Sequence, residues 1–315
     1  MSRKLKFDLT IDANALLCPN PNEFYSKAYI TEEIVDNYRT LPGVKYKTKI
    51  ANVLFDANML KASSCDWTNG TDPLDAVDVD VCAVSAMAQI CRFDLEQSFV
   101  SQWMAKGSQA AMDPSAFMSY YFEEMSKHIA ADIEIIRWQG NSAGSTGTVK
   151  DLCTGYQFKL CATPAVVAIA GTTVTATNVV AEMNKVYAAL IPALQGNPQG
   201  VLRWFVSSNV AAAFLQASFA FSNANIFAVD LANSFNYLGI KIVVAQGMSA
   251  NTMVLTAKTN LLYAFDGDND AKVLKAINLE DTVAEPKLRT RADIKIGFFF
   301  VNPSEIVYYS TDTCS

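Results

Sequence analysis

Two runs of alternating apolar and polar residues, separated by a polar turn, constrain this sequence more than any other feature. The first run begins at Val44 and places lysines on one face, and the second covers residues 74–84. Such period-two alternation predicts strands with two unlike faces. Asn69–Gly70 lies between the runs and is a strong hairpin-turn signal. Because an isolated hairpin of this length is marginal in water, we expect it to lie on another surface.

One long helix is predicted after the hairpin, over residues 114–138. Asp113 is a favourable N-cap residue, and Pro114 suits the first helical position. Apolar residues then recur at spacings of three and four, which gives one apolar stripe: Met118, Phe122, Met125, Ile129, Ile133 and Ile136. The pattern predicts a helix that packs along one side and ends near Gly140.

Helices and strands alternate in the second half of the chain. Asn178 is placed to cap a helix over residues 179–194, and strand, helix and strand patterns follow within 202–245. Residues 251–315 are rich in strand, and the run 291–310 reads as a long pair of strands joined at Asn302–Pro303. This order predicts an α+β protein with a mixed sheet.

The charge balance does not favour nucleic-acid binding as the primary role. The 315 residues carry a net charge of −6, whereas proteins that neutralise phosphates usually show a basic stripe. Two small basic groups, within residues 3–6 and 45–49, are expected to be solvated surface. An acidic protein can still enclose DNA without binding it specifically.

No motif supports a catalytic residue, a cofactor site or a metal site. The glycine-rich loop 140–147 lacks the lysine of a phosphate-binding loop, and the acidic run that starts at Asp266 lacks the Gly and Glu of a calcium-binding EF-hand. His128 is the only histidine, which leaves little choice for a Ser-His or Cys-His relay. We therefore expect no enzyme active site, no cofactor and no metal.

Seven cysteines are scattered at irregular spacings. Their odd number, with an amino-terminal sequence unlike a secretory signal, favours reduced thiols in a cytoplasm over a disulfide framework. No stretch approaches the length of a membrane span. We expect buried, unreactive thiols in a soluble protein.

The order of these parts resembles the major capsid proteins of tailed bacteriophages, whose fold is shared with encapsulin shells. An arm and a long hairpin precede a short helix, a long helix that ends in a glycine turn, an α/β lobe and a return to sheet. The most similar segments are IAADIEIIRWQGNSAG (129–144), NVVAEMNKVYAALIPAL (178–194), RWFVSSNVAAAFLQA (203–217) and YLGIKIVVAQGMSANTMVLTAKTNLLYAFD (237–266). The resemblance spans roughly residues 38–310.

This resemblance implies the tailed-phage major capsid fold, divided into four parts. They are an N-terminal arm (1–43), an extended β-hairpin loop or E-loop (44–84), a peripheral domain (85–154 and 252–315) that holds the spine helix 114–138, and an axial domain (155–251). Only about 40 residues precede the hairpin, so a separate scaffolding protein, or none, is implied.

The implied function is self-assembly as hexamers and pentamers into an icosahedral shell around a double-stranded DNA genome. The implied partners are further copies of the chain and the portal, scaffolding or decoration proteins of the phage, with no membrane. The implied location is the virion, assembled in the cytoplasm of the bacterial host.

Contacts between subunits are expected on the hairpin, the outer face of the spine helix and one axial loop. A hairpin that is marginal alone gains partners on a neighbouring subunit, and such head-to-tail contacts close into rings. The expected contact residues are Val44, Tyr46, Phe55, Trp67 and Val79 in the hairpin, Tyr120, Glu124 and Lys127 on the helix, and Asp230 and Asn236 in the loop.

Three alternatives stay open at the level of sequence. A cellular nanocompartment shell shares the fold but encloses a cargo enzyme instead of a genome. An unrecognised α/β enzyme and a soluble binding module both predict a monomer or a small oligomer. Either of these two leaves the long hairpin without a partner.

Overall fold

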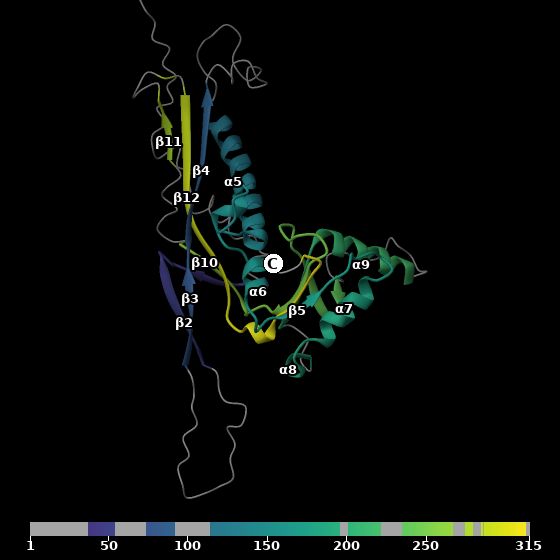
Figure 1. The fold of residues 1–315 in the computed structure, drawn as a ribbon. Coiled ribbons are helices and arrows are strands. Elements are labelled where there is room, and N and C mark those ends of the chain that lie inside the picture. The colour runs from purple at the N-terminus through teal and green to yellow at the C-terminus, as the bar shows by residue number, and fades with distance from the viewer. Residues whose placement is uncertain are drawn as a thin grey trace, which may run out of the picture.

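Two β-sheets and a projecting β-hairpin form the framework of the protein (Figure 1). The computed structural model describes residues 37–53, 74–91, 114–195, 201–221, 235–266, 275–279, 285 and 287–312. Helices pack on both sheets, so the predicted α+β class is confirmed.

The first sheet has five strands and is organised around one long strand, β12. Its members are β1 (Arg39–Pro42), β4 (Cys82–Cys91), β10 (Leu261–Phe265), β11 (Lys275–Asn278) and β12 (Lys287–Phe300). β4 pairs antiparallel with one edge of β12, while β10 and β11 pair with its other edge. The predicted hairpin ends at residue 84, and β4 was not predicted as a separate strand.

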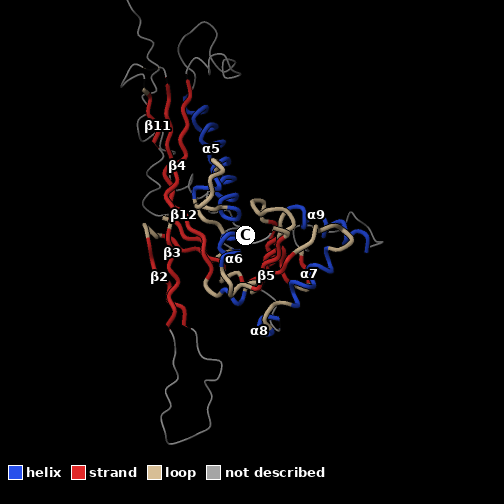
Figure 2. Tube along the Cα trace, viewed as in Figure 1, coloured by secondary structure: helices blue, strands red, loops and turns tan. Residues whose placement is uncertain are grey.

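The predicted spine helix is α5 (Pro114–Gln139), which runs beside β4 and β12 (Figure 2). Its predicted stripe is buried against this sheet: Phe122, Ile129, Ile133 and Ile136 lie in the core, with Met125 packed against them. The alternation of β4 supplies the other side of the contact, because Val84, Ala86 and Ile90 point into the same core.

The hairpin consists of β2 (Lys47–Val53) and β3 (Leu74–Asp80) and continues the long axis of β4 and β12 (Figure 1). The strands pair antiparallel from Lys47↔Asp80 to Val53↔Leu74, as the sequence predicts. The residues that connect them lie outside the described part of the chain. One face of the hairpin base packs on the protein itself, because Val44 and Val79 form a small core with β10.

The second sheet has six strands in the order β5-β13-β9-β6-β8-β7. They are β5 (Val167–Ala170), β6 (Leu202–Val206), β7 (Asn236–Tyr237), β8 (Ile240–Val244), β9 (Met253–Ala257) and β13 (Val307–Ser310). β6 pairs parallel with β8 and antiparallel with β9, so the predicted mixed sheet is confirmed.

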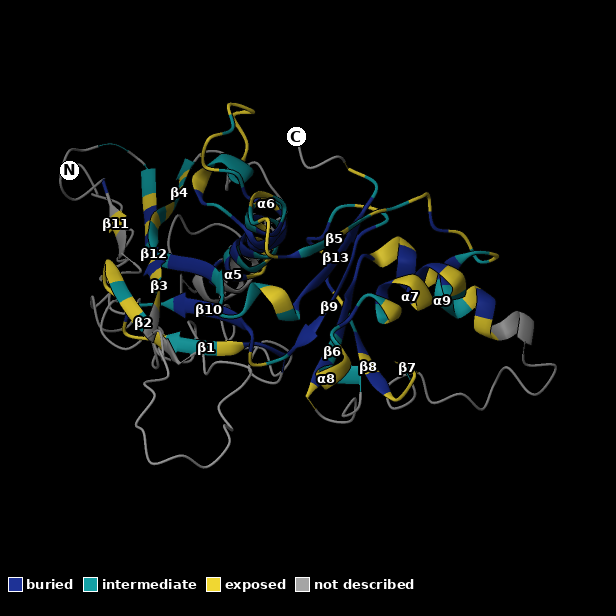
Figure 3. Cartoon of the chain, turned by 60° about the horizontal axis from the view of Figure 1, so that its bottom comes forward, coloured by how far each residue is buried: buried dark blue, intermediate teal, exposed yellow. Residues whose placement is uncertain are grey.

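Helices cover both faces of the six-stranded sheet, and one face joins the core beneath α5 (Figure 3). On one face, α7 (Val179–Ala188) and α9 (Ser208–Phe221) pack against Trp204 and Tyr309. On the other face, Phe205 and Tyr308 join the core of α5 and α6 (Tyr156–Ala162). Both sheets therefore share one continuous hydrophobic interior.

The chain passes between the sheets twice after α9, and this differs from the sequence prediction. β9 lies in the second sheet and β10 in the first, although only three residues separate them. The run 291–310 does form two strands, but β12 and β13 also lie in different sheets. β9 and β13 both lie in the six-stranded sheet, which the sequence does not reveal, because alternation shows a strand without showing its neighbours.

Asn260 holds the two inter-sheet connections together. Its side chain is buried; its Oδ1 accepts hydrogen bonds from the backbone N–H groups of Val301 (3.0 Å) and Asn302 (2.7 Å). Its Nδ2 donates to the carbonyl of Asn302 at 2.8 Å and to Thr256 Oγ1 at 3.2 Å. One amide thus fixes the β9–β10 connection against the β12–β13 connection.

A buried arginine ties the start of the described chain to this shared interior. Arg137, near the end of α5, forms an ion pair with Glu134 and lies 5.2 Å from the ring centroids of both Tyr38 and Tyr263. Burial opposes the charge most strongly, but Glu134 and the neighbouring Tyr38, Tyr263 and Tyr156 together outweigh it and keep the pKa of Arg137 above its usual range. Burial raises the pKa of Tyr263 to about 12.

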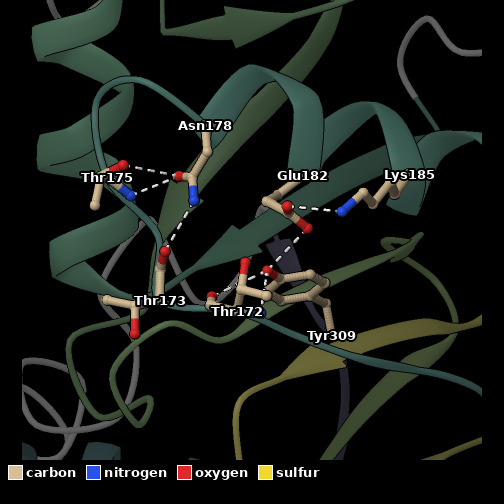
Figure 4. A network of polar contacts seen from close by, with 7 residues as sticks. All are labelled: Thr172, Thr173, Thr175, Asn178, Glu182, Lys185 and Tyr309. Atoms are coloured by element: carbon tan, nitrogen blue, oxygen red, sulfur yellow. Dashed lines mark hydrogen bonds and ion pairs between the residues drawn. The ribbon is translucent and has the colours of Figure 1, made fainter.

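A polar network fixes α7 to the edge of the second sheet (Figure 4). Tyr309 OH donates to Glu182 Oε2 at 3.0 Å and accepts from the Thr172 N–H at 2.9 Å, and Lys185 Nζ lies 2.8 Å from Glu182 Oε1. Burial alone would raise the pKa of Glu182, but the bonds from Lys185 and Tyr309 lower it.

The predicted cap of this helix is wrong in its mechanism. Asn178 precedes α7 with helical backbone angles and makes no side-chain cap. Its Oδ1 instead accepts from the Thr175 N–H at 2.7 Å, and its Nδ2 donates to the Thr173 carbonyl at 2.9 Å. The observed helix is also shorter than the predicted range 179–194. α7 ends at Ala188, and α8 (Pro192–Gln195) follows as a separate turn.

The expectation that the chain forms no disulfide is also wrong. Cys82 and Cys153 form a disulfide, and Cys161 is disulfide-bonded as well. Among the described residues, Cys91 is the free cysteine. Cys82 and Cys153 are 71 residues apart in sequence, so only the folded chain shows that they are neighbours.

Replacing Asn260 tests whether its side-chain hydrogen bonds hold the two inter-sheet connections together. Asn260→Ala loses four side-chain hydrogen bonds in a buried position, so we expect it to lower the free energy of unfolding by about 2–4 kcal/mol in urea titrations. The control is Asn184→Ala, which removes an exposed amide and is expected to cost under about 1 kcal/mol. Equal losses in the two variants would contradict this role.

Acid is expected to weaken the network around Glu182. Its folded pKa lies below the unfolded value, so its contribution is complete above about pH 4.5 and is lost as the pH falls through the folded pKa. Glu182→Gln should cost about 1–2 kcal/mol at pH 7, and stability should then fall less than in the unaltered protein towards about pH 3. Asp132→Asn, at an exposed position on α5, is the control; identical pH profiles for E182Q and the unaltered protein would refute the prediction.

Candidate inter-subunit surface

The face of the five-stranded sheet opposite α5 carries exposed apolar side chains. Because β4 alternates, Ser85, Met87 and Gln89 point away from the core that α5 covers. Met87 is 71% exposed, and Ile277 on β11 is 48% exposed. We call the outward-facing side chains of β4, β11 and β12 on this side the outer sheet face.

Charged side chains surround these apolar residues, and hydrogen bonds hold two of them in place. Arg289 Nε donates to Gln89 Oε1 at 2.9 Å, and Arg291 Nε donates to Asp293 Oδ1 at 2.8 Å. Together they border a hollow of about 730 Å³ that is lined by Met87, Ala88, Gln89, Ile277, Arg289, Thr290, Arg291 and Asp293. An apolar centre with a polar, cationic rim is the usual composition of a protein–protein contact.

The hairpin presents a charged face of its own. Lys47 Nζ lies 3.1 Å from Asp78 and 3.6 Å from Asp80, and Lys49 Nζ lies 3.8 Å from Asp78. The hydrogen bond from Lys47 lowers the pKa of Asp78, and the same bond raises the pKa of Lys47. These ion pairs are exposed, so they keep both charges solvated and give the face a fixed pattern of alternating sign.

The expected contact residues of the hairpin have different environments. Tyr46 is 80% exposed at the start of the hairpin. Val44 and Val79 are buried in the chain's own core beneath the hairpin, because the alternation turns them inward. Phe55 and Trp67 lie outside the described residues.

The remaining expected contact residues are spread over two elements. Lys127 is exposed on α5, which also contains Tyr120 and Glu124, whose side chains lie outside the described part. Asn236 is exposed on β7, and Asp230 lies outside the described residues. The helix and the axial loop therefore offer separate surfaces.

Sequence reasoning missed Met87 and Ile277, the apolar centre of the outer sheet face. A signal was present, because residues 82–91 contain no charged side chain. An uncharged strand with one exposed face favours a covered surface over a solvated one.

The described residues contain no arrangement suited to metal or membrane chemistry. Within them, no group of three or more His, Cys, Asp or Glu side chains could hold a metal ion. His128 is exposed on α5. In the same part of the chain, no helix combines the length and apolarity needed to span a membrane.

Comparison with known proteins finds likeness in structure and none in sequence. No protein-family model and no curated protein matches the chain. A chain of the satellite phage P4 procapsid including size determination (Sid) protein aligns with a TM-score of 0.57 at 10% identity, over 92% of this chain and 97% of that chain.

Two further structures from different sources align with this chain over a similar length. The capsid of an empty GTA particle aligns with a TM-score of 0.54 at 13% identity, over 88% of both chains. A virus-like particle from Pyrococcus furiosus aligns with a TM-score of 0.53 at 11% identity, over 95% of this chain and 97% of that chain. The alignments extend through both sheets, so the chain has the tailed-phage major capsid fold that the order of its elements predicts.

Proposed function

We propose that this chain is the major capsid protein of a tailed bacteriophage, which self-assembles as hexamers and pentamers into an icosahedral shell. The observation that carries the proposal is the fold, which aligns with capsid chains over about nine-tenths of this chain. A projecting hairpin and an uncovered, partly apolar sheet face on the same chain support it.

The hairpin of one subunit lies across the outer sheet face of the next. The hairpin and this face are different surfaces of one chain, so the contact is head-to-tail and repeats around a ring. Met87 and Ile277 lose water in this contact, while Arg289 and Arg291 face the carboxylates of the hairpin. Tyr46, Lys127 and Asn236 supply further contacts on separate surfaces.

The two sheets correspond to the two domains of such a subunit. The five-stranded sheet with α5 is the peripheral domain, and the six-stranded sheet with α7 and α9 is the axial domain. β9 and β13 belong to the axial domain on this assignment, and the hairpin is the extended loop. On this assignment the part of the predicted arm before residue 37, which lies outside the described residues, contacts a neighbouring subunit, whereas β1 pairs with β10 of its own chain.

The shell encloses double-stranded DNA without sequence-specific binding. A net charge of −6 suits enclosure, because an acidic wall does not hold the genome against it. The particle is assembled in the bacterial cytoplasm with portal, scaffolding or decoration proteins. The chain has a structural role and no catalytic one.

Electron microscopy of the expressed protein tests this function directly. We expect rings of five or six subunits, tubes or closed shells in negative stain, with matching light scattering. A monomer at every concentration, including after addition of lysate from the source cells, would refute the proposal. Double-stranded DNA inside native particles distinguishes a virus from a nanocompartment shell, the alternative favoured by the likeness to the archaeal virus-like particle.

Substitution of Met87 tests the outer sheet face. Met87→Glu places a charge at the centre of the contact, so we expect assembled particles to fall at least about tenfold in sedimentation and microscopy. The free energy of unfolding should change by less than about 0.5 kcal/mol, because the side chain is exposed in the subunit. Met87→Leu is the matched control and should assemble normally; assembly of M87E at the normal level would exclude this face.

A further inference from the structure

A disulfide joins two parts of the chain that otherwise meet only by packing. Cys82 and Cys153 are 71 residues apart in sequence, and their Cα atoms lie 5.8 Å apart in the fold. Cys153 is 2% exposed, whereas Cys82 is partly exposed. Both belong to the core between α5 and the five-stranded sheet.

Cys82 marks the root of the hairpin. It is the first residue of β4 and pairs with Ile296 on β12. The preceding residue, Val81, donates its N–H to the Tyr46 carbonyl at 3.0 Å, across the base of the hairpin. A bond to Cys82 therefore holds the point where the hairpin leaves the sheet.

Cys153 belongs to a segment fastened to the end of α5. Asn141 N–H donates to the Lys150 carbonyl at 2.7 Å, and Gly155 N–H donates to the Gly140 carbonyl at 2.9 Å. The backbone at Gly155 lies so close to the last turn of α5 that a Cβ on Gly155 would be 2.4 Å from the Ile136 carbonyl oxygen. Cys153 thus moves with the spine helix.

We propose that Cys82 and Cys153 are an oxidative cross-linking site, which closes after folding and fixes the hairpin root to the spine helix. The chain must fold first, because folding is what brings the two thiols together. A reducing cytoplasm keeps them as thiols during synthesis, and an oxidising medium joins them later. The formation of the cross-link does not depend on the proposed shell function. Its use in stabilising a shell after release from the cell rests on that proposed function.

The oxidant is a small disulfide of the glutathione type, and the reaction balances by thiol–disulfide exchange. The thiolate of the more exposed Cys82 attacks one sulfur of the oxidant, forms a mixed disulfide and releases one small thiol. Cys153, after losing its proton, attacks the Cys82 sulfur and releases the second small thiol. Two protein thiols are oxidised, and one small disulfide is reduced to two thiols.

Peptide mapping tests whether and when the bond forms. We expect Cys153, the single cysteine of tryptic peptide 151–159, to be alkylated when iodoacetamide and a denaturant are added together at lysis, because the denaturant exposes the buried thiol. After incubation with oxidised glutathione, the same peptide should be joined to the peptide that contains Cys82. An alkylated peptide after oxidation would overturn the cross-link, and a joined peptide at lysis would overturn its timing.

Thermal unfolding tests whether the bond stabilises the chain. We expect the oxidised protein to unfold roughly 5–10 °C above the Cys82→Ser variant, and the difference to vanish in reductant. Comparison within each redox condition cancels the contribution of the Cys161 disulfide. Cys91→Ser is the matched control and should follow the unaltered protein in both conditions. A difference that persists in reductant would show that packing causes it and would overturn the inference.

Both tests work on unassembled protein, so they separate this inference from the proposed function. A monomer that forms the bond and gains stability keeps the cross-link and refutes the capsid role. Shells that form with Cys153 alkylated after oxidation keep the capsid role and refute the cross-link.

Discussion

The architecture depends on one constraint, which is that two sheets share a single interior although the chain passes between them repeatedly. Each passage leaves the end of a strand inside a sheet, and its backbone groups must find partners inside the protein. The Asn260 amide, in the β9–β10 connection, provides them for the β12–β13 connection with one side chain. The positions of the hairpin, α5 and the six-stranded sheet relative to each other follow from this junction.

The same constraint decides which surfaces are left for assembly. α5 occupies one face of the five-stranded sheet, and its stripe uses the inward residues of β4 completely. On the outward side of that strand, Gln89 accepts a hydrogen bond from Arg289, whereas the large apolar side chain of Met87 is 71% exposed. In the six-stranded sheet both faces are covered, so only its edges and loops remain for contacts in the proposed assembly.

The sequence predicted the individual helices and strands better than it predicted which of them pack or pair with each other. The spacing of Phe122, Ile129 and Ile133 predicts α5, because helical periodicity reports a buried side directly. It could not show that β12 and β13 lie in different sheets, since pairing partners leave no local pattern. Val44 and Val79 were expected at a subunit contact for the same reason; alternation separates two faces but does not say which is inward. The Cys82–Cys153 pair is a long-range contact of the same kind.

The length of β12 has a mechanical consequence. β4 is bonded to it over ten residue pairs, and the ladder hydrogen bonds lie across the strand direction. A pull along the hairpin therefore acts on these bonds in shear, and many must break together before the strands slide. A pull at right angles would open them one at a time, like a zipper. The chain is consequently stiff along the axis of its hairpin and compliant across it, an anisotropy that suits the wall of the proposed shell under outward pressure.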